Sequence, residues 1–356
     1  MIKINMTNYG LSERFLSESK LYENLTVGRI ISQDKDLYKT ITENGEKRAQ
    51  VSGKFRYNAS SLSDYPSTGD FVMLSDNEDG NAIIHHVLTR KSAFIRRAAG
   101  TSNNEQVVAA NIDTVFICMS LNNDFNLRRL ERYMGVAWDS GATPVVLLTK
   151  ADLNSGIEQT MAELQTVALS TDIIVTSSMT DDGYLPVMEY IRPGKTVAFI
   201  GSSGVGKTTL VNRLVGSSVY ETNSTRNDDR GRHTTTKREL VLLNSGGIVI
   251  DTPGMRELGI ESADLSKAFS DIDELSSLCR FNDCTHTTEP GCAVIEAIKN
   301  GTLSKERFSS FLKLKKEAKY DGLNSKQIET KKINEMFKDH GGMKNARKHM
   351  KNKKMM

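Results

Sequence analysis

The sequence has few cysteines, few prolines and no long apolar run. Its 356 residues include 4 Cys, 6 Pro and 1 Trp. Apolar runs such as 145–148 and 197–200 fall far short of the roughly 18–20 residues that span a bilayer, which argues against a membrane helix. Four cysteines in a chain of this length exclude a disulfide scaffold. The first 14 residues lack the apolar core and cleavage site of a secretory signal, so we expect a cytoplasmic protein.

No sign of charge dominates the chain as a whole, because the formal net charge is only +3. Residues 313–356, however, hold 14 Lys or Arg against 5 Asp or Glu, so this tail carries +9 and the remainder −6. Such a tail is either a solvated helix end or a contact for a nucleic-acid backbone, and both interpretations stay open. The hydrophobic fraction of 38% excludes wholesale disorder, and the length predicts two to three domains.

Three patterns follow one another along the chain. From about 24 to 97, short alternating runs separated by Gly, Asn, Asp and Pro predict a small all-β unit. From 111 to about 259, apolar strands alternate with helical stretches, which predicts a mostly parallel sheet covered by helices and a hairpin-like pair around 244–247. From about 262 onward the pattern is helical around a cluster of cysteines.

The segment GSSGVGKT at 201–208 fits the pattern G-x-x-x-x-G-K-[ST]. It follows the apolar run TVAFI and precedes the helix-forming KTTLVNRLV, which is the context that the motif requires. The backbone N–H groups of such a loop surround a β-phosphate, Lys207 reaches the β- and γ-phosphate oxygens, and Thr208 places its hydroxyl on Mg²⁺. The predicted phosphate-binding residues are Gly201, Ser202, Ser203, Gly204, Val205, Gly206, Lys207, Thr208 and Thr209.

A second phosphate-linked element closes the run GIVIDTPG. Asp251 stands at the end of an apolar strand, where it can hold the Mg²⁺ shell while the amide of Gly254 meets the γ-phosphate. The polar segment 217–237 lies between the two elements. A threonine there can complete the Mg²⁺ sphere only while a γ-phosphate holds the segment in place, which predicts an order–disorder switch. The sequence leaves open whether the ligand is Thr234, Thr235 or Thr236.

The tetrapeptide TKAD at 149–152 resembles the N/T-K-x-D element that reads guanine. Asp152 would accept hydrogen bonds from two guanine N–H donors at once, and adenine presents no such pair. Thr149 precedes Lys150 where Asn is usual and offers only a hydroxyl. Ser177 and Ser178, after the run IIVT, stand where a serine and its amide help to hold guanine. Together these residues predict specificity for GTP.

The order of these elements is unusual. The base-reading elements at 149 and 177 precede the phosphate-binding loop at 201, whereas in a Ras-like domain that loop comes first. We infer that the domain is circularly permuted, which leaves the site intact because domain termini lie close together. The strand ending in Asp251 then leads directly into the C-terminal segment, so the state of the switch can be transmitted to that segment.

Three of the four cysteines lie within 14 residues and share their segment with a histidine. The spacing is that of a closed, tetrahedral, structural zinc site with no open position for a catalytic water. The alternative is a set of reduced buried cysteines beside an exposed histidine. Without zinc we expect this segment to lose its fold. Cys118 lies apart in an apolar run, where we expect a small buried hydrophobe. The predicted zinc ligands are Cys279, Cys284, His286 and Cys292.

On these motifs, together with GRII, GDFVML, AANIDTVF, GRHTTTKREL, DTPGMRELG, CRFNDCTH and EPGCAV, the sequence resembles one family over nearly its whole length. This is the ribosome small-subunit-dependent, circularly permuted GTPase A family. The resemblance implies an N-terminal OB-fold barrel that binds rRNA, a central α/β P-loop GTPase domain and a mainly helical zinc domain. It also implies hydrolysis of GTP to GDP during late maturation of the small ribosomal subunit, with Mg²⁺ bound beside GTP and one structural Zn²⁺. We expect a monomer that has no membrane partner.

On this basis the chain divides into an extension (1–23), an OB-fold domain (24–102), a permuted GTPase domain (103–261), a zinc domain (262–312) and a basic helical tail (313–356). The expected RNA-facing side chains of the barrel are basic residues interleaved with aromatics. They are Lys54, Arg56, Arg90, Lys91, Arg96 and Arg97, with Phe55, Tyr57 and Phe94.

The expected mechanism is a GTP-controlled timer. Bound GTP with Mg²⁺ orders 217–237 and the segment after Asp251 while the OB-fold and zinc domains hold rRNA, and hydrolysis relaxes these switches and releases the rRNA. Met255 occupies the position at which Ras-like enzymes carry a water-orienting glutamine, so intrinsic hydrolysis should be slow. The missing group is either His233 or a group of the ribosomal particle, and the catalytic candidates in the chain are Lys207, His233 and Thr235. Two other hypotheses stay open: an rRNA-binding scaffold with a structural nucleotide site, and a zinc enzyme with a nucleotide cofactor.

Overall fold

The computed structural model describes residues 3–77, 80–97, 105–122, 125–153, 156–168, 171–177, 183–202, 204–216, 239–251 and 269–319. Its strands are β1 (Thr26–Asp34), β2 (Leu37–Thr42), β3 (Gly45–Val51), β4 (Phe71–Ser75), β5 (Ala82–Val87), β6 (Ala93–Arg97), β7 (Glu105–Ala110), β8 (Thr114–Ser120), β9 (Thr143–Thr149), β10 (Asp172–Val175), β11 (Thr196–Ile200), β12 (Glu239–Leu242) and β13 (Ile248–Asp251). Its helices are η1 (Met6–Tyr9), α1 (Glu13–Ser19), α2 (Gly53–Asn58), η2 (Leu62–Asp64), α3 (Leu127–Asp139), η3 (Ala151–Leu153), α4 (Ile157–Gln165), α5 (Leu185–Met188), α6 (Lys207–Val215), α8 (Ser270–Ser277), α9 (Ala293–Lys299) and α10 (Lys305–Lys319).

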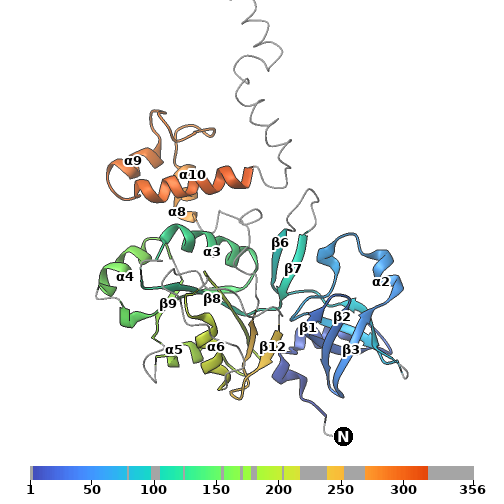
Figure 1. The fold of residues 1–356 in the computed structure, drawn as a ribbon. Helices are drawn as coiled ribbons and strands as arrows, with labels where there is room; N and C mark the ends of the chain where they lie inside the picture. The colour runs from blue at the N-terminus through green and yellow to red at the C-terminus, as the bar shows by residue number, and fades with distance from the viewer. Residues whose placement is uncertain are drawn as a thin grey trace, which may run out of the picture.

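The central domain is a sheet between two layers of helices (Figure 1). Its strand order is β10-β9-β8-β11-β13-β12, in which only β12 runs antiparallel to its neighbour β13. The strands are near-continuous apolar runs because both faces are buried. Two successive residues of β8 lie on opposite faces of the sheet. Ile117 packs in the core with α3 and α4, whereas Phe116 packs in the core with α5 and α6.

The N-terminal unit is a closed five-stranded barrel. Strands β1 to β5 pair in the order β1-β2-β3-β5-β4, and β4 pairs again with β1. Only the β3–β5 pair is parallel, and this arrangement is that of an OB fold. Strand β1 can pair with both β2 and β4 because it is nine residues long and contains an irregularity between Ile30 and Ser32. The expected all-β unit is therefore present.

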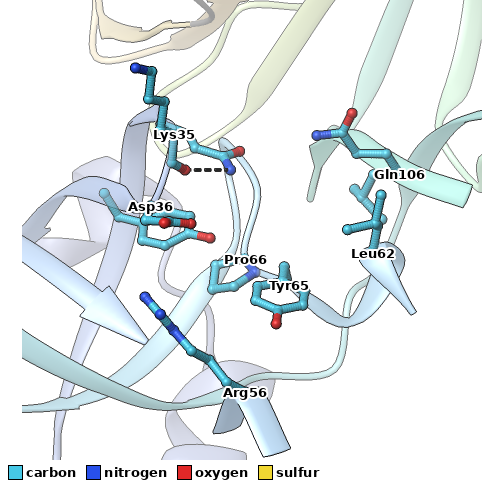
Figure 2. A pocket seen from close by; sticks show the side chains of 10 residues that line it. Lys35, Asp36, Arg56, Leu62, Tyr65, Pro66 and Gln106 are labelled. Atoms are coloured by element: carbon cyan, nitrogen blue, oxygen red, sulfur yellow. Dashed lines mark hydrogen bonds between the residues drawn. The ribbon is translucent and has the colours of Figure 1, made fainter. Parts of the chain in front are cut away.

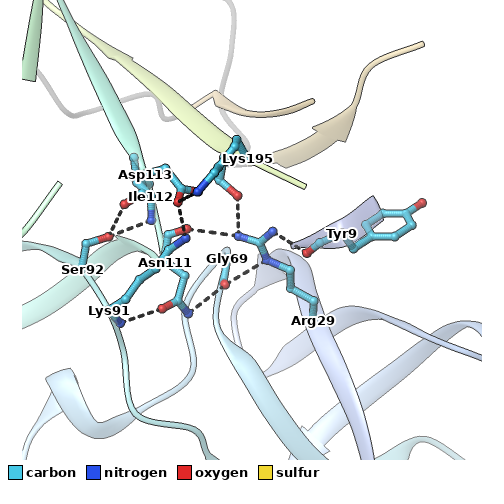
Figure 3. Close-up of polar contacts among 10 residues, drawn as sticks. Tyr9, Arg29, Gly69, Lys91, Ser92, Asn111, Ile112, Asp113 and Lys195 are labelled. Atoms are coloured by element: carbon cyan, nitrogen blue, oxygen red, sulfur yellow. Dashed lines mark hydrogen bonds and ion pairs between the residues drawn. The ribbon is translucent and has the colours of Figure 1, made fainter. Parts of the chain in front are cut away.

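A buried arginine joins the barrel to the central sheet (Figure 3). Arg29 of β1 is 1% exposed, and its guanidinium donates to the carbonyl of Gly69 at 3.1 Å and to the hydroxyl of Thr196, in β11, at 2.9 Å. It also donates to the carbonyl of Tyr9 at 2.6 Å and to that of Asn111 at 3.3 Å. The pair Ser32–Glu239 between β1 and β12 merges both units into one 11-stranded sheet.

The C-terminal module consists of α8, α9 and α10 and lies against α3 (Figure 1). Its own small core contains Phe269, Phe308 and Phe311. Leu314 belongs to the same core, so α10 continues through the expected boundary at 312/313. A second of the four expected internal boundaries, at 102/103, falls between the paired strands β6 and β7. The division into domains remains a proposal.

Two further sequence expectations concern local structure. The hairpin around 244–247 is confirmed, because β12 and β13 pair antiparallel from Glu239–Asp251 to Leu242–Ile248. Among the described residues, no helix is both long and apolar enough to cross a bilayer.

Candidate functional site

The predicted nucleotide-binding residues gather at one edge of the central sheet. Thr149 ends β9, Asp251 ends β13, and Gly201 follows β11 directly. Ser177 lies two residues beyond β10. Because these four strands are parallel, their carboxyl ends meet at the same edge, which is where open α/β sheets bind ligands.

Two glycines give the phosphate-binding loop its shape. Gly201 has a φ of +143°, and a Cβ there would lie 2.4 Å from the carbonyl oxygen of Cys118. Both the backbone conformation and this close contact exclude a side chain. Gly206 has a φ of +95° and is the N-cap of α6, a backbone conformation that favours glycine. The neighbouring Cys118 is fully buried in the apolar core, which confirms the expectation that this cysteine is a small buried hydrophobe, and burial raises the pKa of its thiol to about 12.

Lys207 lies within the loop that its motif predicts. It is the first residue of α6, and its ammonium donates to the carbonyl oxygens of Gly201 at 2.7 Å and Ser202 at 2.6 Å. Thr208 follows in the first turn and is partly exposed, as the expected Mg²⁺ ligand must be. Val205 is buried and Thr209 is exposed.

The base-reading residues form a second loop beside the first. Asp152 lies in η3 with its side chain exposed, and Ser177 donates its hydroxyl hydrogen to the Asp152 carboxylate at 2.5 Å. The backbone of Lys150 adopts a φ of +58°. The amide of Ala151 donates to the carbonyl of Thr176 at 3.3 Å. Asp152 and Ser177, 25 residues apart, are thus brought together as the sequence predicts.

Thr149 has a role that sequence reasoning missed. Its hydroxyl donates to the carbonyl oxygen of Val205 at 2.6 Å, and the carbonyl of Met119 lies 3.3 Å away. The side chain is buried. This hydroxyl therefore joins the base-reading loop to the phosphate-binding loop.

Several predicted residues lie outside the described part of the chain. They are Ser178, Ser203, His233, Thr234, Thr235, Thr236, Gly254 and Met255. Their roles, including the choice of threonine as Mg²⁺ ligand, stay predictions. Asp251 is described as the last residue of β13, one position beyond the Ala198–Ile250 pair with β11.

The four predicted zinc ligands converge. The ligand atoms of Cys279, Cys284, His286 and Cys292 lie within 4.8 Å of one another. The sulfurs of Cys279 and Cys292 are 3.8 Å apart, and the His286 Nδ1 lies 3.6 and 3.4 Å from them. A tetrahedral ion with bonds of about 2.3 Å to sulfur and about 2.0 Å to nitrogen holds its ligand atoms at such separations, so the residues fit a metal.

Neighbouring groups orient these ligands. The His286 Nε2, on the far side of the ring from the sulfurs, lies 3.2 Å from the hydroxyl of Ser276. Cys292 is the N-cap of α9, and its sulfur accepts from the amide of Ile295 at 3.4 Å. A helix N-terminus favours the thiolate that binds a metal. This arrangement supports a structural centre.

The expected RNA-facing residues divide into two groups. Arg90 pairs with the buried Asp70 at 2.8 Å, Lys91 pairs with Asp113 at 2.8 Å, and Phe94 is fully buried. The prediction that these three face RNA is wrong, because Arg90 and Lys91 are paired with Asp70 and Asp113 within the fold and Phe94 fills the core. Lys54, Arg56 and Tyr57 are exposed, Phe55 and Arg96 are half-buried, and the side chain of Arg97 lies outside the described part of the chain.

A pocket of about 260 Å³ lies between the barrel and strand β7 (Figure 2). Leu62, Tyr65 and Pro66 supply apolar wall, and Lys35 and Arg56 supply positive charge. Its other lining residues are Gln33, Asp36, Tyr38, Gln106 and Val107. Apolar and aromatic surface beside cations is what an unstacked nucleobase and its phosphate require.

One contact to the phosphate-binding loop has no signature in the sequence. The guanidinium of Arg129, in the first turn of α3, donates to the hydroxyl of Ser202. The two residues are 73 positions apart, and no motif links them.

Comparison with known proteins identifies the relatives of this chain. The model of the RsgA GTPase family matches residues 87–261. Small ribosomal subunit biogenesis GTPase RsgA 2 of Lactiplantibacillus plantarum is 47% identical over 345 residues, covering 97% of this chain and 98% of the relative. Small ribosomal subunit biogenesis GTPase RsgA 1 of Listeria innocua is 44% identical over 318 residues, covering 88% of this chain and 90% of the relative.

Solved structures agree. The crystal structure of YjeQ from Thermotoga maritima is 26% identical with a TM-score of 0.62, covering 83% of this chain and 98% of that one. The crystal structure of YloQ, described as a circularly permuted GTPase, has the same fold with a TM-score of 0.60 at 24% identity, covering 83% of this chain and 96% of that one.

Proposed function

This chain belongs to the RsgA GTPase family, and on that premise we propose that it hydrolyses GTP while bound to the small ribosomal subunit, late in the maturation of that particle. It is a ribosome biogenesis GTPase with the circularly permuted fold. The finer proposal is that the small subunit stimulates hydrolysis and that its rRNA is the partner of the barrel. Such a partner places the protein in the cytoplasm, where we propose that it acts as a monomer.

The observation that supports the proposal most strongly is the hydrogen-bonded contact between the TKAD loop and the phosphate-binding loop at the carboxyl edge of the sheet. Thr149 ties the TKAD loop to the phosphate-binding loop through the Val205 carbonyl. Ser177 orients the Asp152 carboxylate, which remains exposed for a base. Base recognition by Asp152 and phosphate recognition around Lys207 are therefore held at a fixed separation, as one nucleotide requires.

Binding of the triphosphate changes the partners of Lys207. Its ammonium exchanges the carbonyls of Gly201 and Ser202 for β- and γ-phosphate oxygens, and the amides of the loop surround the β-phosphate. The hydroxyl of Thr208 and the carboxylate of Asp251 are hard oxygen donors suited to Mg²⁺. The ion would neutralise charge that develops on the phosphates.

The chain lacks a glutamine after its D-x-x-G element, so we propose that water activation depends on the particle. His233 is the candidate within the chain, and Thr235 with its neighbours is the candidate for the γ-phosphate-dependent Mg²⁺ ligand. Ser178, Ser203 and Gly254 complete the proposed nucleotide contacts.

The metal that we propose for the Cys279, Cys284, His286 and Cys292 cluster is Zn²⁺. Three thiolates and one imidazole form a soft, tetrahedral donor set, which zinc occupies in structural sites. Since all four positions of a tetrahedral ion are filled by the protein, the metal would stabilise the module and leave no site for chemistry.

The barrel pocket is the proposed contact for rRNA. An unstacked base would lie against Tyr65 and Leu62, with Lys35 and Arg56 beside its phosphates. Tyr65→Ala should weaken binding to the small subunit, since base–aromatic stacking contributes about 1–3 kcal/mol. The exposed Arg48, elsewhere on the barrel, provides a matched control as Arg48→Ala.

The function is tested by steady-state phosphate release from the full-length protein, with and without purified small subunits, and with ATP as the control nucleotide. We expect slow hydrolysis of GTP alone and many-fold stimulation by the subunit. Lys207→Ala should lower the stimulated rate by about 10²-fold or more, because it removes a charge that stabilises the transition state. An unchanged rate on adding subunits would refute the dependence. Normal subunit maturation with Lys207→Ala would favour the scaffold hypothesis.

A further inference from the structure

Helix α3 lies between the phosphate-binding loop and the C-terminal module (Figure 1). Asn126 caps it, and the Asn126 side chain accepts from the amide of Arg129 at 3.1 Å. Two residues of this helix make contacts in opposite directions. Arg129 reaches the loop, and Glu131 reaches the module. Two positions along an α-helix differ by about 200° around its axis, so the helix can contact both neighbours at the same level.

The contact with the module is a buried ionic cluster. Arg307 of α10 and Glu131 of α3 have side chains that are 5% and 3% exposed, and their charged atoms are 3.0 Å apart. The same guanidinium forms a two-pronged pair with Asp271 of α8, at 2.8 and 2.7 Å. It also lies over the ring of Phe269, 4.9 Å from its centre. The position of α3 is thus fixed to two helices of the module.

The contact with the loop is a hydrogen bond to a side chain of the nucleotide site. The Arg129 guanidinium donates to the hydroxyl of Ser202, whose own carbonyl accepts from Lys207. A displacement of α3 at Glu131 therefore moves Arg129, since a helical turn is stiff, and changes the support of Ser202. The path from Arg307 to the loop consists of contiguous contacts, each of which is a short polar bond or helix backbone.

We propose that Arg307 is a positioning residue for the phosphate-binding loop: through Glu131 it sets the place of α3, and through Arg129 this helix holds Ser202 in the conformation that binds nucleotide. The proposal rests on the proposed nucleotide function of that loop. It assigns the metal-binding module a role in nucleotide retention, by a route separate from the segment after Asp251. Whatever seats or displaces the module on α3 would then change the lifetime of bound nucleotide.

The test is the release rate of a fluorescent GDP analogue from full-length protein in the absence of ribosomal subunits. Arg307→Met keeps the volume and removes the charge, and it should accelerate release by about 2- to 30-fold, the range of such indirect couplings. Glu131→Gln should act in the same direction with a smaller effect. Arg280→Met alters another arginine of the module, one that lies over Phe281, and should leave the rate unchanged.

A double-mutant cycle separates positioning from general loosening. If the route ends at Ser202, then Ser202→Ala accelerates release and Arg307→Met adds little in that background. Multiplicative effects, or a wild-type rate for Arg307→Met with retained metal content, would overturn the proposal. Arg307→Lys keeps the charge but cannot form the two-pronged pair with Asp271, so its GDP release rate should lie between those of wild type and Arg307→Met. If the wild-type protein bound no GDP, the proposed function would fail instead, so the two outcomes are distinct.

Discussion

Two buried arginines join the central sheet to its neighbours, and their partners differ. Arg29, at the barrel, is held by carbonyls and a hydroxyl, and burial lowers its pKa to about 10. Arg307, at the C-terminal module, is held by two carboxylates, whose pairing raises its pKa in spite of burial. The barrel also shares a sheet with the central domain, whereas the module meets it through side chains of α3 and α10.

The difference indicates how each neighbour can act. Backbone acceptors and a shared sheet make the barrel and the nucleotide domain one cooperative unit. An ion pair between two helices permits the module to shift as a body, because its own core and metal ligands lie within 269–319. We therefore expect changes at the barrel junction to affect global stability and changes at the module to affect nucleotide handling.

Metal removal should give the largest effect, and this effect should be confined to the C-terminal module. Structural zinc supplies on the order of 10 kcal/mol of folding free energy in small modules. A chelator should expose 269–319 to protease while GDP binding persists, with release accelerated about as much as by Arg307→Met. Limited proteolysis with mass spectrometry and metal analysis provide the measurement, and re-addition of Zn²⁺ is the control. Loss of all nucleotide binding would contradict a separable module.

Arg29→Met should destabilise the barrel and the nucleotide domain together. The carbonyls of Gly69 and Asn111 and the hydroxyl of Thr196 would lose a buried donor, at a cost of about 3–5 kcal/mol. Urea unfolding followed by the fluorescence of Trp138, the single tryptophan, measures this loss. Arg48→Met is the surface control. A midpoint equal to that of wild type would show that the junction is not held by Arg29.

Thr149→Val tests the joint between the two nucleotide loops. The substitution keeps the shape of the side chain but leaves the buried carbonyl of Val205 without its donor. The expected loss is about 1–2 kcal/mol, or roughly 5- to 30-fold in GDP affinity. Calorimetric titration with GDP measures it. Thr209→Val changes an exposed position of α6 and should lower GDP affinity less than Thr149→Val does. Equal losses of affinity would contradict a bridging role for Thr149.

The smallest expected effects concern pH. The contributions of the two junctions to stability should change with pH in opposite directions. Burial alone would raise the pKa of Asp113, but Lys91 and the amide of Thr196 outweigh burial and lower it. A lowered folded pKa stabilises above the ordinary value near 3.9, and this contribution disappears as pH falls through the folded pKa. Asp113→Asn should therefore reduce the loss of stability that occurs as pH falls below the ordinary value.

Glu131 is the counterpart at the module. Burial raises its pKa, with Ser310 and Arg307 opposing. A raised folded pKa gives a contribution that is complete below the ordinary value of about 4.3 and is lost as pH rises through the folded pKa. Glu131→Gln should remove that opposite slope. Urea unfolding of both variants across the acid range distinguishes the two trends, and identical slopes would contradict the comparison.

The sequence predicts what local pattern determines. The phosphate-binding loop follows from glycine spacing between a strand and a helix, and the metal cluster follows from the spacing of Cys279, Cys284, His286 and Cys292. The parallel sheet and the OB-fold barrel follow from runs of alternating or continuous apolar residues and from the family resemblance.

Contacts between distant residues were not predictable. Arg29 and Thr196 are 167 positions apart, and Arg307 and Glu131 are 176 apart. Nothing in the periodicity of either segment indicates its partner, because the pairing depends on how whole domains pack. The same limit explains the error at Arg90 and Lys91, whose charges are used by Asp70 and Asp113 inside the fold.

We propose that the terminal phosphate of the nucleotide decides whether the protein holds the small subunit. The most direct measurement is co-sedimentation of full-length protein with purified small subunits in a non-hydrolysable GTP analogue and in GDP, at one fixed salt concentration. We expect stable binding with the analogue, weak binding with GDP, and no difference between them for Lys207→Ala. Equal binding of wild type in both nucleotides would contradict it.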